Sequence, residues 1–438
     1  MKQKLIFIIL WILILAIFSQ AQIVQAKNEN SNLSVEQWQA DLRFLAEEMP
    51  KQHKNLFHTM TKEQFESAVK KLDVNIPSLS RQQIIVEMAR IVAMVGDGHT
   101  SLSPARDPKV GFRTFPIKLY VFNDGVFVRS ATRENSKLLG ARLVKIGDVS
   151  VAQAYEAVKQ IIGRDNEMDI KFFAPFLLVM PEVLNGLGLI GEMENVKFTF
   201  ENDEEQWTVD LKPFGKAEMI NPDTDNSWLP KDGWIDARDT SKSPTPLWLK
   251  DPNNKFWFEY LPDSKMLYFQ LNQVGDKENE KLESFVQKLF AFAETKEINK
   301  FVLDLRLNRG GNNYLNRSLL LGVIRAIKID QKGKFFTIIG RSTWSAAQML
   351  TNDLEKYTNT IFVGELSGGK VNSYGDSRKI VLPNSEITVR VSSLWWQQDE
   401  RDKRQWTEPN IKAELSFTDY QINRDPALEA IFSYQTKP

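Results

Sequence analysis

Ser345 lies where a strand-forming run gives way to a helix-forming run, a position from which serine can act as a nucleophile. Residues 335–339 are apolar and end at a glycine, so they predict an interior strand, and residues 346–350 predict the start of a helix. The first N–H groups of a helix are unpaired and partially positive, which favours an alkoxide or an oxyanion. The alternative for this segment alone is that Ser345 only caps the helix, since serine is a preferred N-cap residue.

A second polar segment would supply the other side of an acyl-transfer site. Residues 301–305 predict a buried strand, and Gly310 and Gly311 follow it in a polar turn. Adjacent glycines allow positive φ and a close approach of the backbone to a ligand, although a plain tight turn would also use them. We expect the N–H groups of Gly311 and Ala346, with Gly310 beside them, to hold an oxyanion.

The residues that could activate this serine are few. The chain has three histidines and no cysteine, so a thiol nucleophile and thiolate metal sites are excluded. His53 and His58 lie in a polar connection between two predicted helices, where we expect them to be solvated. His99 follows a Gly-Asp-Gly turn, and by itself it is most simply explained as a turn histidine with local hydrogen bonds. We expect no metal and no other cofactor.

Several separate segments resemble, in the same order, the tail-specific (C-terminal-processing) serine protease superfamily. The resemblance covers most of the chain after the N-terminal apolar run, and it implies a crotonase-like α/β protease core with Ser345 as the nucleophile. The segments that carry it are residues 96–100 (Gly-Asp-Gly-His-Thr), 304–311, 343–347, 363–369 and 408–411.

The resemblance leaves two candidates for the general base. It is closer to the tricorn-like branch, which carries its base in a segment that matches the one holding His99, and so it implies that His99 is the base. In the Ser-Lys branch a lysine near the position of Lys370 has this role, and a lysine of lowered pKa can perform it. This chain has Val371 where that branch has glycine, so Lys370 is the alternative base or a surface lysine on a glycine loop.

A third group should orient the base or polarise the site. The tricorn-like branch has a glutamate shortly before the segment that matches residues 408–411. Here Glu400, Asp402 and Glu408 all precede Pro409, and we select Asp402, with a solvated charged loop as the alternative. Glu365 is expected to be structural.

Composition and the N-terminal residues indicate an exported protein that acts on neither nucleic acid nor polyanions. Lys+Arg and Asp+Glu both number 56, and no basic block is present. Two lysines precede an apolar run at residues 5–18, and a small-residue cleavage site ends at Ala26. This pattern predicts a signal peptide at residues 1–26 and an extracytoplasmic location without stable membrane insertion after cleavage, uncleaved anchoring being the alternative.

The rest of the chain predicts a mixed α/β protein of three domains. Residues 27–100 predict a helical domain with three capping boxes. Residues 101–215 predict a β-rich module that resembles a PDZ domain, with an unrelated β-module as the alternative. Residues 216–253 predict a linker, and residues 254–438 predict a parallel α/β catalytic domain. The capping boxes pair Ser34 with Gln37, Thr61 with Gln64, and Ser80 with Gln83.

Together these features predict an extracytoplasmic serine endopeptidase that cleaves polypeptides through an acyl-enzyme. The alternative is a catalytically inactive protein that binds peptides or other ligands on the same fold. The sequence does not determine the oligomeric state or the cleavage specificity.

Overall fold

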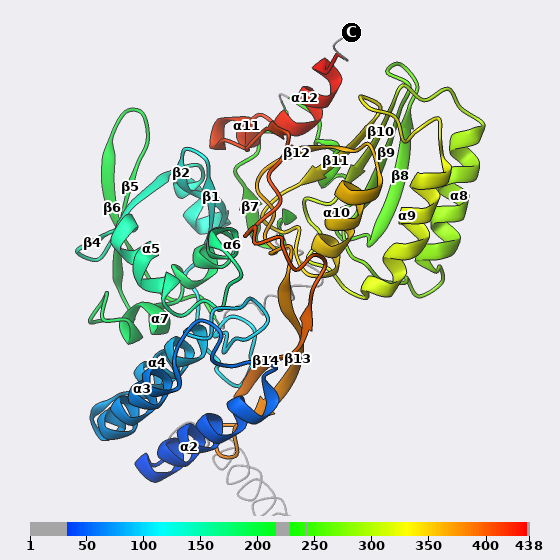
Figure 1. Cartoon of the computed structure of the whole chain (residues 1–438). Helices are drawn as coiled ribbons and strands as arrows, with labels where there is room; N and C mark the ends of the chain where they lie inside the picture. Colours follow the sequence, from blue (N-terminus) through cyan, green and yellow to red (C-terminus); the bar gives the residue numbers. More distant parts are fainter. Residues whose placement is uncertain (1–32, 216–227, 242, 436–438) are drawn as a thin grey trace, which may run out of the picture.

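The computed structural model describes residues 33–215, 228–241 and 243–435. The predicted signal peptide therefore lies outside the described residues, as does part of the predicted linker. Figure 1 shows a β-rich lobe and an α/β lobe, with the N-terminal helices below the first and a long hairpin reaching down to them from the second. Within the described residues, no helix has the length and apolar character that crossing a membrane requires.

The N-terminal segment is helical, as the capping boxes predict. The three helices are α2 (Val35–Gln52), α3 (Lys62–Asn75) and α4 (Arg81–Ala93), and each starts with its expected capping box. A short 3₁₀ turn, η2 (Ile76–Ser78), connects the last two. Each helix turns an apolar face inward, and the fully buried residues of α2 recur at the three- and four-residue spacing of one helix face.

The β-rich lobe is one antiparallel sheet with three helices, of which α5 and α6 pack against the sheet and α7 packs against α4. The strand order is β1-β2-β3-β5-β6, with β4 pairing to β3 and β7 to β2. A tight turn after Phe122 joins β1 and β2 into an antiparallel hairpin. The strands are β1 (Ile117–Phe122), β2 (Gly125–Thr132), β3 (Arg142–Ile146), β4 (Val149–Ser150), β5 (Val196–Glu201), β6 (Gln206–Leu211) and β7 (Trp234–Asp236), and the helices are α5 (Val151–Lys159), α6 (Glu167–Leu177) and α7 (Pro181–Gly186). Helices α6 and α7 were not expected, and β7 lies in the segment predicted to be a linker.

The α/β lobe contains the expected parallel sheet. Its order is β15-β12-β11-β10-β9-β8, in which only β8 pairs antiparallel. Helices α8, α9 and α10 cover one face of the sheet and α12 covers the other, so that Phe301 and Leu303 point to one core and Val302 to the other. The strands are β8 (Phe256–Leu261), β9 (Met266–Leu271), β10 (Lys300–Asp304), β11 (Phe335–Ile339), β12 (Ile361–Gly364) and β15 (Ile411–Lys412), and the helices are α8 (Leu282–Glu294), α9 (Asn316–Arg325), α10 (Ala346–Tyr357) and α12 (Pro426–Ser433). A short helix, α11 (Phe417–Gln421), precedes α12 along the chain.

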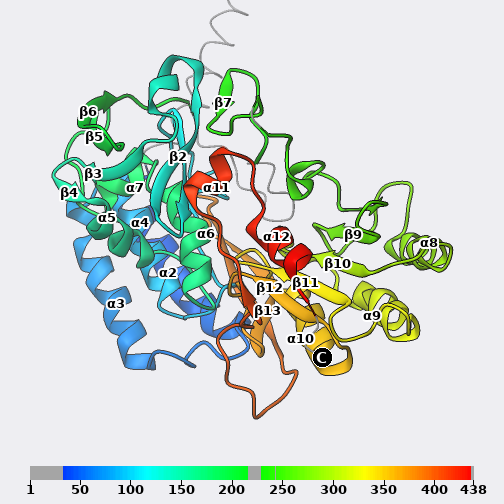
Figure 2. The ribbon, with the colours of Figure 1, turned by 90° about the horizontal axis from the view of Figure 1, so that it is seen from above.

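The hairpin of β13 (Ser373–Val381) and β14 (Thr388–Trp396) connects the lobes. It belongs by sequence to the predicted catalytic domain, yet Ile380, Val389 and Val391 are buried in the same hydrophobic core as the N-terminal helices and the β-rich sheet. Near the C-terminus, α11 lies beside the β-rich lobe and α12 beside the α/β lobe (Figure 2). One hydrophobic core includes residues on both sides of residue 100, so the domain boundary predicted there does not separate two cores.

We expect truncation of a buried hairpin residue to destabilise the N-terminal core. Val389 is fully buried there, so Val389→Ala should lower the free energy of unfolding by about 2 kcal/mol. Val381 lies on the paired strand and is 52% exposed, so Val381→Ala provides a matched control with little effect. Urea unfolding of both variants makes the comparison, and equal losses would mean that the hairpin does not contribute to this core.

Candidate active site

Ser345 occupies a sharp turn between β11 and α10. Its backbone has φ 53° and ψ −124°, a conformation that non-glycine residues rarely adopt. A strained strand-to-helix turn of this kind pushes a serine hydroxyl out from the end of a sheet, as in the nucleophile elbow of hydrolases. The Ser345 side chain makes no capping hydrogen bond to α10. The capping explanation therefore does not account for this serine.

The glycine turn after β10 passes directly beside the serine. A Cβ atom on Gly310 would lie 2.7 Å from Ser345 Cβ and 2.8 Å from the Ala346 nitrogen. A Cβ on Gly311 would lie 2.1 Å from the carbonyl oxygen of Val274, and both glycines have positive φ, so side chains are excluded at both positions.

The two glycines differ in the availability of their N–H groups. The Gly310 N–H donates to Asn308 Oδ1 at 2.8 Å. Neither Gly311 nor Ala346 donates its N–H to another residue within the described parts of the chain. The pair expected at the oxyanion is thus free beside Ser345, whereas Gly310 contributes by allowing the close approach.

His99 reaches Ser345 from the other lobe. Its Nε2 lies 3.1 Å from Ser345 Oγ, across 246 positions of sequence. The hairpin holds the loop that carries His99: Ser377 Oγ donates to the His99 carbonyl at 2.8 Å, and Ser101 exchanges backbone hydrogen bonds with Arg390. The histidine and the serine are therefore placed for transfer of the hydroxyl proton.

The surroundings of His99 keep its imidazole neutral. Burial lowers the pKa of His99 to about 4; the charges of Asp97 and Asp376 oppose this shift, and those of Arg309 and Arg106 add to it. Acceptance of the Ser345 proton at Nε2 requires the ring proton to be on Nδ1, and Nδ1 is buried with no hydrogen-bond partner among the described residues.

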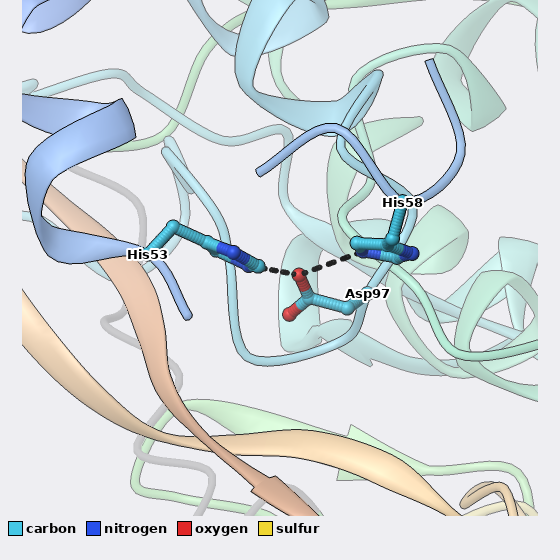
Figure 3. Close-up of side chains that lie close together, drawn as sticks. All are labelled: His53, His58 and Asp97. Carbon is cyan, nitrogen blue, oxygen red and sulfur yellow. Dashed lines mark hydrogen bonds and ion pairs between the residues drawn. The ribbon is translucent and has the colours of Figure 1, made fainter. Parts of the chain in front are cut away.

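Asp97 organises the loop that carries His99. The Oδ1 atom accepts the N–H groups of His99 at 3.0 Å and Thr100 at 2.8 Å, and the hydroxyl of Ser392 in β14 at 2.6 Å. The Oδ2 atom lies 2.9 Å from His53 Nε2 and 3.8 Å from His58 Nε2. Figure 3 shows the two imidazoles on either side of the carboxylate. His53 is buried, so the expectation that both histidines are solvated is wrong.

The cluster of His53, His58 and Asp97 has the residue types of a metal site but the hydrogen bonding of a structural network. The Asn55 N–H donates to His53 Nδ1 at 2.9 Å, which assigns the ring proton to Nε2. That proton is donated to Asp97, so His53 has no free lone pair for a metal. The cluster instead ties the α2–α3 connection to the His99 loop.

The other sequence candidates do not join Ser345 and His99. Lys370 lines a surface depression with Asp165 and makes no hydrogen bond to Ser345 among the described residues. Asp402 is bonded to Arg404, and it does not contact His99. Glu408 pairs with Lys412 on the surface. Glu365 forms a buried pair with Arg341, as expected for a structural residue.

Two side chains near the base were missed by the sequence analysis. Trp344 stacks on His99 with ring centroids 3.8 Å apart, and its indole N–H donates to the buried carboxylate of Asp165 at 2.8 Å. Trp344 lies in a segment that carries the family resemblance, but no sequence pattern marks a tryptophan that stacks on a histidine. Asp165 lies in a segment without any motif.

Comparisons with known proteins give matches among solved structures alone. No family model and no curated protein sequence matches the chain. The chain is similar to mature CPAF (TM-score 0.58, 10% identity, 91% of this chain and 96% of that chain) and to mature CPAF complexed with lactacystin (TM-score 0.61, 10% identity, 91% and 97%). It is also similar to the photosystem II D1 C-terminal processing protease, with TM-score 0.40 and 13% identity over 90% and 96% of the two chains. The expected mixed α/β fold is confirmed, and it is the fold of CPAF.

Neutralising Asp97 should make the stability of the protein less dependent on pH. Burial alone would raise the pKa of Asp97, but hydrogen bonds from His53 and Ser392, with the His58 ring close by, hold it well below the ordinary value. This contribution is fully present above the unfolded pKa of about 4, begins to decrease below it, and is lost as the pH falls through the lower pKa of the folded state. We therefore expect Asp97→Asn to lower the free energy of unfolding by about 3 kcal/mol at pH 7 and by less at pH 3.5.

Urea unfolding at the two pH values measures this difference. The control is Asp210→Asn, which removes a carboxylate that is paired with Lys197 on the surface and should change little at either pH. A loss for Asp97→Asn that is the same at both pH values would contradict the assignment of a charged carboxylate to Asp97.

His99 should remain neutral far below the ordinary histidine pKa. Because burial lowers its pKa to about 4, its Cε1–H resonance should titrate with a midpoint near that value in an NMR experiment. With three histidines in the chain, a His99→Gln variant assigns the signal directly. A midpoint near the unperturbed value of about 6.5 would show that the ring is solvated.

Proposed function

We propose that this protein is a serine peptidase of the tail-specific protease superfamily that cleaves polypeptides through an acyl-enzyme. The observation that carries the proposal is the 3.1 Å contact between His99 Nε2 and Ser345 Oγ at a strained strand-to-helix turn. The order of the motifs along the chain and the shared fold of CPAF support it further.

In the proposed reaction, Ser345 Oγ attacks the carbonyl carbon of the scissile peptide while His99 Nε2 takes the hydroxyl proton. The carbonyl oxygen becomes an oxyanion, which accepts hydrogen bonds from the N–H groups of Gly311 and Ala346. His99 then gives its proton to the leaving amine as the C–N bond breaks. A water molecule, deprotonated by His99, attacks the resulting ester and frees the carboxylic acid and Ser345.

The substrate would approach through the apolar cavity between the lobes. A cavity of about 250 Å³ has Tyr120, Phe172 and Phe176 of the β-rich lobe on one side and Leu307 and Ser342 of the α/β lobe on the other. Ser342 lies in the turn that leads to Ser345, so a chain bound in the cavity can continue to the nucleophile. Its aromatic lining favours substrates with apolar side chains near the cleaved bond.

We further propose that the protein acts outside the cytoplasm. The basis is the N-terminal sequence, in which lysines, an apolar run and a small-residue cleavage site follow one another. The absence of cysteine is compatible with an oxidising compartment, since the fold then needs no disulfide there.

Substitution of the nucleophile should abolish hydrolysis without unfolding the protein. We expect Ser345→Ala to reduce cleavage of a fluorogenic polypeptide by at least about 10⁴-fold and to abolish labelling by a fluorophosphonate probe. His99→Ala should have a similar effect on hydrolysis, whereas Lys370→Ala should retain activity. Near-native circular dichroism would show that the fold is kept.

Ser318→Ala is the matched control, because Ser318 lies on α9 and its hydroxyl donates only to the carbonyl of Leu315. Activity that survives in Ser345→Ala would refute the proposed nucleophile. Loss of activity in Lys370→Ala but not in His99→Ala would show that Lys370, and not His99, is the general base. A folded wild-type protein that neither labels nor cleaves, but binds peptides, would favour the binding protein instead.

A further inference from the structure

The proposed mechanism leaves the charge on His99 without a partner in the plane of the ring. When His99 takes the Ser345 proton it becomes an imidazolium inside the protein, where an unpaired charge is costly. Other serine hydrolases place a carboxylate on Nδ1 to stabilise this cation. Here Nδ1 is buried without a hydrogen-bond partner in the described part of the chain, so stabilisation must come from another direction.

The face of the His99 ring is covered by Trp344. The two rings are 3.8 Å apart between centroids and inclined by 20°, which is a stacked arrangement. The face of an indole carries negative electrostatic potential and attracts a cation more strongly than any other aromatic side chain. The Trp344 ring therefore interacts only weakly with the neutral imidazole, and it attracts the imidazolium once His99 has taken a proton.

Asp165 connects Trp344 to the loop of the base. Its Oδ2 accepts the indole N–H of Trp344 at 2.8 Å, and its Oδ1 accepts the backbone N–H of Gly98 at 2.9 Å. A Cβ on Gly98 would lie 3.0 Å from the Trp344 ring and 3.1 Å from Asp165 Oδ2, so this close packing depends on glycine. A carboxylate on the indole N–H pushes electron density into the ring, which strengthens its attraction for a cation.

We propose that Trp344 and Asp165 are positioning residues that stabilise the imidazolium of His99 through its ring face, in place of a carboxylate on Nδ1. The proposal rests on the peptidase function proposed above and deepens it. The carboxylate acts on the indole, and the indole acts on the imidazolium that exists only during proton transfer. The pair thus stabilises the transition state more than the bound substrate.

A buried ion pair between Arg309 and Asp169 lies beside this stack. The guanidinium of Arg309 lies 4.9 Å from the centre of the Trp344 ring and is paired with Asp169 at 3.5 Å. Asp169 also accepts the backbone N–H of Asp165 at 2.9 Å. Burial and the charge of Asp169 raise the pKa of Asp165 to about 7, with Lys370 opposing the shift and Asp97 adding to it.

Because Asp165 becomes a carboxylate only above this pKa, kcat should rise with pH in a step near 7. Protonation of His99 itself, with its pKa near 4, would affect activity only at lower pH. The charged groups that face His99 are Asp97, Asp376, Arg309 and Arg106. The step should disappear in Asp165→Asn, in which the residual activity should be independent of pH across this range.

The test is a double-mutant cycle on Trp344→Phe and Asp165→Asn in the full chain. Trp344→Phe keeps a stacking ring but removes the N–H, and Asp165→Asn removes the charge. Each should lower kcat per labelled active site roughly tenfold with KM nearly unchanged. Because Asp165 acts through the indole N–H, the double variant should lose no more than the larger single loss. The matched controls Trp207→Phe and Asp210→Asn, in β6, should behave like wild type.

A second measurement is independent of hydrolysis. The NMR titration midpoint of His99 should be lower in Trp344→Phe than in wild type, because the weaker ring stabilises the imidazolium less. Additive losses in the cycle, or a pH step that persists in Asp165→Asn, would overturn the proposal, as would an unchanged His99 midpoint. If wild type proves not to be a peptidase, the NMR comparison still decides whether Trp344 stabilises the cation.

Discussion

The contact between His99 and Ser345 joins two separate hydrophobic cores. Ser345 is fixed by the core of the parallel sheet, whereas His99 follows α4, which belongs to the core shared by the N-terminal helices and the β-rich sheet. The distance between His99 and Ser345 therefore depends on how the two lobes pack against each other. The β13–β14 hairpin provides that packing, because it leaves the α/β lobe and buries its apolar side chains in the other core.

Buried charges then fix the loops at the ends of the parallel strands. Arg306 forms two bonds to Asp425 and two to Asp304, and Arg341 pairs with Glu365. Each arginine lies just after a strand that leads to a site segment, so the glycine turn and the serine turn are held before any substrate binds. Such buried pairs contribute more to geometry than to stability, because desolvation offsets most of their attraction. An oxyanion site needs this rigidity, since its donors must be in place when charge develops.

The sequence predicted the parts of the fold and the site that depend on local pattern. Apolar runs identified the strands at residues 301 and 335, and the three capping boxes identified the helix starts. Ser345, His99 and the glycine turn were identified because each lies in a motif. The burial of His53 against Tyr374 and the place of the hairpin depend on contacts between residues more than 300 positions apart, which no local pattern encodes. Asp402 was chosen because the family resemblance implies an acidic residue shortly before residues 408–411, and a resemblance of this kind cannot tell a surface loop bonded to its own arginine from a loop that reaches the base.

A base without an in-plane carboxylate also has a thermodynamic advantage in this environment. A carboxylate on Nδ1 would raise the pKa of His99 and would favour the imidazolium before substrate arrives, when Ser345 needs a neutral acceptor. The partly buried ring near Arg309 and Arg106 is held neutral instead. Stabilisation through the ring face also favours the imidazolium, but it is weaker than an ion pair, so it raises the pKa of His99 only slightly and leaves the proposed base neutral in the resting protein. The site can therefore combine a strongly lowered pKa with proton transfer, provided that the indole beneath the base remains in place.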